Sequence, residues 1–136
     1  MIMAVSPWLM PVQPLTTHIE PETIEKKEVR PLTLEEMIRE RARINNLNEE
    51  KIIYIARCES QLDHQAIGDG NLTCASTKKP MRSRGIWQIN ECGHPEISDA
   101  QAFDPAWSTD WAMEVFKKGG EAKEWQRCAN KYLSMI

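Results

Sequence analysis

Apolar residues that recur every three or four positions predict a helix that begins after Thr33. Thr33 and Glu36 stand three residues apart at its start, a spacing typical of a capping box. Asn45 and Asn46 then favour a left-handed exit from the helix. The apolar stripe of this helix comprises Leu34, Met37, Ile38, Ala42 and Ile44.

A second helix is predicted to begin after Asn48 and to run to about Ser60. Asn48 is a favourable N-cap, and two glutamates follow it in the first turn, where the helix dipole favours acidic side chains. The apolar positions of this helix are Ile52, Ile53, Ile55 and Ala56.

The rest of the chain alternates between loops and short helical patterns. Residues 61–84 contain several turn signals and predict a loop. Residues 85–90 are apolar and β-branched, so they fit either a strand or the start of a buried helix. Further helices are predicted at about 105–118, where two glycines follow, and at about 122–134.

Residues 1–32 differ from the rest of the chain in composition. Residues 1–17 carry no charge and contain three prolines, which fits either a remnant of a signal or anchor segment or a disordered tail. Residues 18–31 are polar, charged and rich in proline, as is typical of a disordered linker. We therefore expect a folded domain at 33–136, with membrane anchoring as one possible role of the segment before it.

The charge balance narrows the range of partners. The chain has 17 lysines and arginines against 20 aspartates and glutamates, so its formal net charge is -3. The strongly basic character of most nucleic-acid-binding proteins is absent, which argues against nucleic acid as a partner. No apolar run reaches the roughly 18 residues that a membrane-spanning helix needs.

The chain contains four cysteines, Cys58, Cys74, Cys92 and Cys128. Their even number indicates two disulfides formed in an oxidising compartment, with three pairings open. Four reduced, buried thiols are one alternative. A zinc site that includes His94 is another, although the closely spaced cysteine pairs of structural zinc sites are missing.

Glu59 is the strongest candidate for a catalytic residue. Its position in the second helix puts it on the same face as Ile52 and Ala56. Burial on an apolar face raises the pKa of a carboxyl group, and the negative end of the helix dipole acts in the same direction. Such a group can remain protonated near neutral pH and serve as a general acid. The alternative is a purely structural ion pair with Arg57, Lys51 or a base elsewhere in the chain.

Two segments resemble lysozyme-like lytic transglycosylases, of the superfamily that includes goose-type and soluble enzymes. Residues 56–63 (ARCESQLD) end a predicted helix in Glu-Ser, and residues 83–90 (SRGIWQIN) are similar to the segment that lines the glycan groove in that family. The resemblance covers residues 33–136. It implies an α+β, predominantly α-helical, lysozyme-like domain with a glycan-binding groove.

The resemblance also implies a reaction. Glu59 would cleave peptidoglycan between N-acetylmuramic acid and N-acetylglucosamine, first as acid and then as base, with a 1,6-anhydro product and no cofactor or metal. A lysozyme-type hydrolase with Asp63 or Asp69 as second carboxylate is the alternative, and a non-catalytic glycan-binding module is another. The implied partner is the glycan strand of peptidoglycan. The implied location is outside the cytoplasm, as a secreted, periplasmic or cell-surface protein, and the implied oligomeric state is a monomer.

By the same resemblance, the substrate-binding residues are Ser60, Gly85, Trp87, Gln88, Asn90 and Tyr132. Gln88 would bond a sugar N-acetyl group, and Gly85 would let the backbone approach the glycan. Trp87 stands where the family usually has Met or Leu, and it could stack on a sugar or fill the core.

A Cys-Glu-Ser triplet followed by a C-terminal Trp-x-x-Cys is similar to the resuscitation-promoting factors, which cleave cell walls. That resemblance implies a disulfide between Cys58 and Cys128 and leaves Cys74 to pair with Cys92. The first bridge would tie the helix that carries Glu59 to the last helix.

A basic stretch precedes the groove segment and consists of Lys78, Lys79, Arg82 and Arg84. It could attract the carboxylates of peptidoglycan or form a solvated loop.

Overall fold

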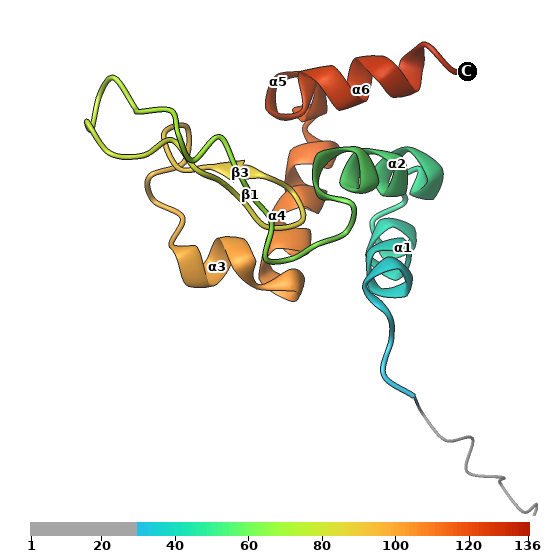
Figure 1. Ribbon diagram of the computed structural model, residues 1–136. Helices are drawn as coiled ribbons and strands as arrows, with labels where there is room; N and C mark the ends of the chain where they lie inside the picture. Colours follow the sequence, from blue (N-terminus) through green and yellow to red (C-terminus); the bar gives the residue numbers. More distant parts are fainter. Residues whose placement is uncertain (1–29) are drawn as a thin grey trace, which may run out of the picture. The chain divides into compact units, whose positions relative to one another are not determined.

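The computed structural model describes residues 30–136, of which residues 31–136 form one compact unit (Figure 1). The signal or anchor segment predicted at the start of the chain lies outside the described residues. A small three-stranded sheet accompanies the helices, which confirms the predicted α+β, mainly helical class. The elements in chain order are α1 (Leu34–Ile44), α2 (Glu49–Ser60), β1 (Ile67–Gly68), β2 (Ser83–Arg84), β3 (Ile89–Asn90), α3 (Asp99–Phe103), α4 (Pro105–Lys117), α5 (Glu121–Glu124) and α6 (Gln126–Leu133).

Local capping explains where the first two helices begin. Thr33 Oγ1 accepts a hydrogen bond from the backbone N–H of Glu36 at 3.2 Å. Asn48 Oδ1 likewise accepts one from the backbone N–H of Lys51 at 3.2 Å. Each bond satisfies a donor that the first helical turn leaves without a partner. Both helix starts are therefore confirmed, and α2 ends at Ser60 as predicted.

The sheet is antiparallel, with the strands in the order β1, β2, β3. β2 is central, and Ser83 lies opposite Gly68 of β1 and opposite Asn90 of β3. Each strand has two residues, so the sequence shows no alternating pattern. The loop predicted for 61–84 was wrong at the four residues that form β1 and β2. The long segment between β1 and β2 projects away from the sheet in Figure 1.

The short helix α3 is missing from the sequence-based prediction. Ser98 and Gln101 form a complete capping box at its start, in which each side chain bonds the backbone of the other residue. α4 follows directly and corresponds to the helix predicted at 105–118. Asp104 caps α4 by accepting hydrogen bonds from the backbone N–H groups of Ala106 and Trp107, and Pro105 occupies the first turn.

The last predicted helix, 122–134, is divided in two by Trp125. This residue has a φ of −128° and a ψ of 46°, which interrupts the helix between α5 and α6. The break brings its indole into the core, where Trp125 is 2% exposed and Nε1 donates to the carbonyl of Trp87 at 2.7 Å. The tertiary position of the indole thus overrides the continuous helical pattern in the sequence.

Trp87 fills the core and does not line a groove. Its side chain is 0% exposed, and its Nε1 donates a hydrogen bond to Thr109 Oγ1 at 3.1 Å. Its ring packs against Phe116 and Trp125, with centroid distances of 5.9 and 5.4 Å. The substrate-binding role expected for Trp87 is therefore corrected, because a fully buried ring cannot stack on a sugar.

All four cysteines are bonded in two disulfides. Cys58 pairs with Cys128 and links α2 to α6 with a Cα–Cα distance of 5.9 Å, and Cys74 pairs with Cys92. These are the pairs that the resemblance implies. Thiolate ligation of zinc is incompatible with this bonding, and no group of three ligating side chains occurs within residues 30–136.

Candidate active site

Glu59 lies in the last turn of α2, where two neighbours hold it in place. Cys58 anchors this turn to α6 through its disulfide. Ser60 is 9% exposed, and its hydroxyl donates to the carbonyl of Ala56 at 3.2 Å. Because this hydroxyl is used inside the helix, Ser60 supports the helix end, and the substrate contact expected for it stays a prediction.

The carboxyl group of Glu59 has no hydrogen bond or ion pair with any side chain in the part of the chain that the structure describes. Two cations of the same helix, which were considered as its partners, bond elsewhere. Arg57 bonds Glu35 at 2.6 Å, and Lys51 bonds Glu121 at 2.7 Å. The structural ion pair considered for Glu59 is therefore absent.

Burial raises the pKa of Glu59 from 4.5 to about 7. The positive charge of Arg127 on α6 acts in the opposite direction, and the negative charge of Asp69 raises the pKa further. The carboxyl group therefore retains its proton to a much higher pH than a glutamate in water does. This is the protonation behaviour that a general acid requires.

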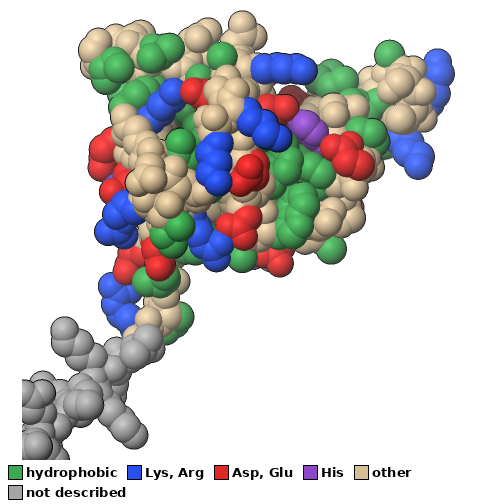
Figure 2. Space-filling view, turned by 180° about the vertical axis from the view of Figure 1, so that it is seen from behind, with side chains coloured by type: hydrophobic (Ala, Val, Ile, Leu, Met, Phe, Trp, Pro, Cys, Tyr) green, Lys and Arg blue, Asp and Glu red, His purple; other side chains and the backbone are tan. Residues whose placement is uncertain are grey.

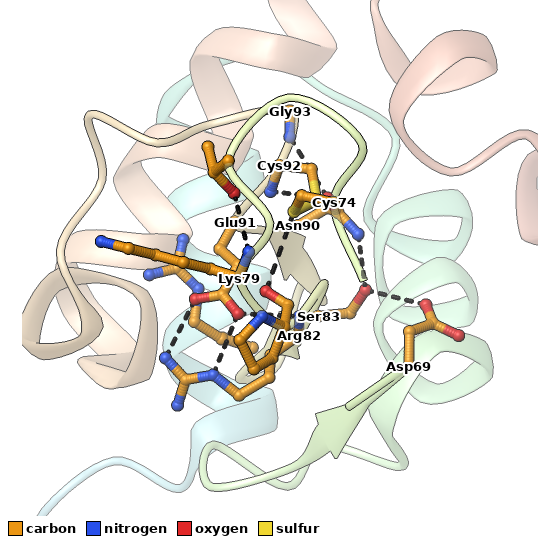
Figure 3. The surroundings of a disulfide bond; sticks show 12 residues. Asp69, Cys74, Lys79, Arg82, Ser83, Asn90, Glu91, Cys92 and Gly93 are labelled. Atoms are coloured by element: carbon orange, nitrogen blue, oxygen red, sulfur yellow. Dashed lines mark hydrogen bonds and ion pairs between the residues drawn. A yellow bond between two sulfur atoms is a disulfide. The ribbon is translucent and has the colours of Figure 1, made fainter. Parts of the chain in front are cut away.

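A second group of polar side chains gathers on one face of the sheet, which we call the polar sheet face; it comprises Asp69, Ser83, Gln88 and Asn90. Ser83 Oγ donates to Asp69 Oδ2 at 3.0 Å, and Asn90 Nδ2 approaches Ser83 Oγ at 3.4 Å (Figure 3). Asn90 Oδ1 accepts hydrogen bonds from the backbone N–H groups of the next turn, at 2.9 Å from Cys92 and 3.2 Å from Gly93. The amide of Asn90 is thus largely used within the protein.

Gln88 belongs to the same face and has a constrained geometry. Its backbone is left-handed, with a φ of 47°, and its Nε2 donates to the carbonyls of Gly85 at 2.9 Å and Ala66 at 3.3 Å. Its Oε1 lies against Gly68, where an added Cβ would be only 2.5 Å away. Only Oε1 of this amide therefore remains available to a ligand.

Two further predicted site residues, Gly85 and Tyr132, have defined contacts within the protein. Gly85 has a φ of 76°, and an added Cβ would lie 2.3 Å from the carbonyl oxygen of Ala102. This glycine is thus required by the approach of α3, and the approach of its backbone to a glycan stays a prediction. Tyr132 packs its ring against Tyr54 of α2, with a centroid distance of 5.6 Å.

The two candidates for a second carboxylate have different surroundings. Asp63 Oδ1 accepts a hydrogen bond from the backbone N–H of Gln65 at 2.9 Å, which is ordinary turn chemistry. Asp69 instead interacts electrostatically with Glu59 and is bonded by Ser83. Asp69 is therefore the carboxylate that the fold brings near the candidate acid.

The basic stretch divides into free and paired side chains. Arg82 bonds both Glu91 and Asp99, at 3.0 and 2.9 Å, and Arg84 is 2% exposed and also bonds Asp99. Only the lysines remain exposed, at the tip of the projecting segment, where Figure 2 shows Lys or Arg side chains. The positive charge available to a ligand is thus smaller than the sequence indicates.

Replacing Gly68 by alanine should disturb the polar sheet face without unfolding the domain. The new Cβ would displace the Gln88 side chain from its two backbone carbonyls, so we expect kcat/KM to fall about tenfold, comparable to the loss of one hydrogen bond to a charged or polar group. Gly70→Ala is the matched control, since its nearest neighbours would be 3.8 Å away. Equal activities of the two variants in a wall-digestion assay would contradict a role of the Gln88 side chain in substrate binding.

Comparison with known proteins agrees with this geometry. A family model described as a lysozyme like domain matches residues 45–127, which include α2 with Glu59, the whole sheet and α3 to α5. Searches of curated proteins and of solved structures returned no match. The family match covers more than half of the chain, and the chain therefore belongs to the lysozyme-like domain family.

Proposed function

We propose that this protein cleaves the β-1,4 bond between N-acetylmuramic acid and N-acetylglucosamine in peptidoglycan, with Glu59 as its single acid and base. One observation carries the proposal. In a lysozyme-like domain, Glu59 is an unpaired carboxyl group whose pKa is raised to about 7 by burial. A peptidoglycan glycosidase is the activity that such a domain suggests, and the transglycosylase reaction is the more specific part of the proposal.

Glu59 would serve twice in one turnover. Its protonated carboxyl gives a proton to the glycosidic oxygen, and the bond from that oxygen to C1 of the muramoyl residue breaks. The resulting carboxylate takes the proton of the C6 hydroxyl of the same sugar, whose oxygen bonds to C1. The products are a free N-acetylglucosamine end and a 1,6-anhydromuramoyl end, with Glu59 protonated again. A pKa near the working pH suits both steps, and no cofactor is needed.

A hydrolase is the second candidate, and the position of Asp69 favours it. Glycosidases that use water generally need two carboxylates, one as acid and one as base or nucleophile. Asp69 interacts with Glu59 electrostatically and is bonded by Ser83. In this case Asp69 would activate water or attack C1, and the muramoyl end would be a reducing sugar.

Digestion of purified peptidoglycan in isotopically labelled water, followed by mass spectrometry, tests the proposal. A transglycosylase leaves muramoyl ends that are one water lighter and carry no label, whereas a hydrolase leaves reducing ends that carry it. Unlabelled anhydro ends would support the proposed reaction. Labelled reducing ends would replace it by hydrolysis, and binding to peptidoglycan without cleavage would leave only the glycan-binding module.

The same proposal implies where the protein works. Peptidoglycan lies outside the cytoplasm, and the two disulfides require an oxidising compartment. We therefore propose an extracytoplasmic monomer, secreted, periplasmic or at the cell surface. Residues 1–32 would serve as a signal or anchor remnant and linker ahead of a catalytic domain at 33–136.

A further inference from the structure

Ser83 occupies the centre of the polar sheet face. It lies directly opposite Gly68 on one side and Asn90 on the other, so side chains at these three positions point to the same face of the sheet. Arg84, the next residue, points the other way and donates its Nε hydrogen to the carbonyl of Ile89. Ser83 is therefore the side chain of β2 that meets Asp69, which follows Gly68 directly.

We propose that Ser83 is a positioning residue, which holds the Asp69 carboxylate in place near Glu59. The inference rests on the proposed function, since it assigns a role within that site. Ser83 does not itself contact a reacting atom. It acts through Asp69, whose carboxylate lies at the end of a chain of hydrogen bonds.

The fixed end of that chain is the turn after β3. There Asn90 Oδ1 accepts hydrogen bonds from the backbone N–H groups of Cys92 and Gly93, and Cys92 is bonded to Cys74 (Figure 3). Asn90 Nδ2 then approaches Ser83 Oγ at 3.4 Å, and Ser83 is 6% exposed. A serine hydroxyl has one hydrogen to donate, and accepting from Asn90 favours its donation to Asp69.

Asp69 needs such a support because it is exposed and stands in a left-handed turn, with a φ of 57°. Within residues 30–136, the Ser83 hydroxyl is the one side chain that donates a hydrogen bond to this carboxylate. An exposed carboxylate without a partner samples several rotamers, and an anion that moves freely in water has a weaker effect on a neighbouring charge.

The held anion has two effects on the reaction. Among the residues that the structure describes, two charged groups act on Glu59, namely Arg127 from α6 and Asp69 from the loop after β1. Asp69 opposes the ionisation of Glu59. Asp69 also supplies negative charge as positive charge develops at C1 in the oxocarbenium-like transition state. Loss of the Ser83 hydroxyl should weaken both effects, although the Asp69 charge itself remains.

The test compares Ser83→Ala, Asp69→Asn and the double variant with wild type. Asp69→Asn removes the charge but leaves an oxygen that can still accept from Ser83. We expect Ser83→Ala to lower kcat about fivefold with little change in KM, and the double variant to lose no more than Asp69→Asn, because coupled residues are non-additive. Ser108→Ala is the matched control, since this buried serine of α4 bonds only a local carbonyl.

An NMR titration of the Glu59 carboxyl adds a readout that does not depend on activity. The midpoint of this titration should move to lower pH in Ser83→Ala and in Asp69→Asn. In Ser83→Thr, which keeps the hydroxyl, the midpoint should remain at the wild-type value. A Ser83→Ala variant with the kcat and titration midpoint of wild type would overturn the inference. If wild type released no fragments, the proposed reaction would fail, and the titration would still decide whether Ser83 positions Asp69.

Discussion

Replacing Glu59 by glutamine is expected to lower kcat at least about a thousandfold, while the affinity for peptidoglycan changes little. Glutamine keeps the size and polarity of the side chain but has no proton to give, and general acid catalysis contributes a factor of about 10² to 10⁴. Here the same group would act again as the base, so its loss affects both halves of the reaction. Release of soluble fragments from purified peptidoglycan measures the effect.

Asp63→Asn is the matched control for this variant. It also converts a carboxyl into an amide close to the end of α2, but Asp63 only accepts a backbone hydrogen bond from Gln65. Its activity should be within about twofold of wild type, as expected for a surface substitution. Undiminished wall cleavage by Glu59→Gln would remove Glu59 as the catalyst.

The pKa of Glu59 also gives Glu59→Gln a distinct stability profile. The folded-state pKa of about 7 lies above the ordinary value of 4.5, so folding favours the protonated group. The stability that Glu59 contributes is complete below pH 4.5 and is lost as the pH rises through 7. Glutamine has no such loss, and the variant should therefore become more stable than wild type between pH 4.5 and 7. Carboxyl groups with lowered pKa, such as Asp99, affect both proteins equally.

Removal of the Cys58–Cys128 disulfide is the second large effect that we expect. The bridge closes a loop with a sequence separation of 70 residues, and the chain-entropy model gives a loss of about 4 kcal/mol in the free energy of unfolding. Domains of this size have roughly 5–15 kcal/mol in total. A Cys58→Ala, Cys128→Ala variant should therefore unfold at a much lower denaturant concentration.

The second bridge provides the comparison. Cys74 and Cys92 are separated by 18 residues, so the same model gives a smaller loss of about 3 kcal/mol when both are replaced. Denaturant unfolding of the two double variants should follow this order. A loss below about 1 kcal/mol for the Cys58–Cys128 variant would mean that packing, such as the contact between Tyr54 and Tyr132, holds α6 on α2 without help.

The features that the sequence predicts well depend on local chemistry. The helix starts after Thr33 and Asn48 depend on a cap and the first turn, all within a few residues. The environment of Glu59 follows from helical spacing, which puts a carboxyl on an apolar face. These parts of the fold and of the site are therefore accessible from the sequence alone.

The features that the sequence does not predict depend on distant parts of the chain. Each strand of the sheet has two residues, too few for a periodic pattern. The burial of Trp87 depends on its contacts with Phe116 and Trp125. The need for a glycine at position 85 depends on the nearby carbonyl group of Ala102 in α3. A signal for α3 was present in the Ser-x-x-Gln capping box. The hydrogen bond from Ser83 to Asp69 has no signal in the sequence, because it depends on the register in which β2 pairs with β1.

The most direct measurement of the central claim is an NMR titration of the Glu59 side chain in the intact protein. Partial burial of the carboxyl group raises its pKa, Asp69 raises it further and Arg127 lowers it, which together predict a midpoint near pH 7. The decrease of kcat/KM at high pH should follow the same group, because the acid must carry its proton. A midpoint near 4.5, as for a glutamate in water, would contradict the assignment of Glu59 as the proton donor.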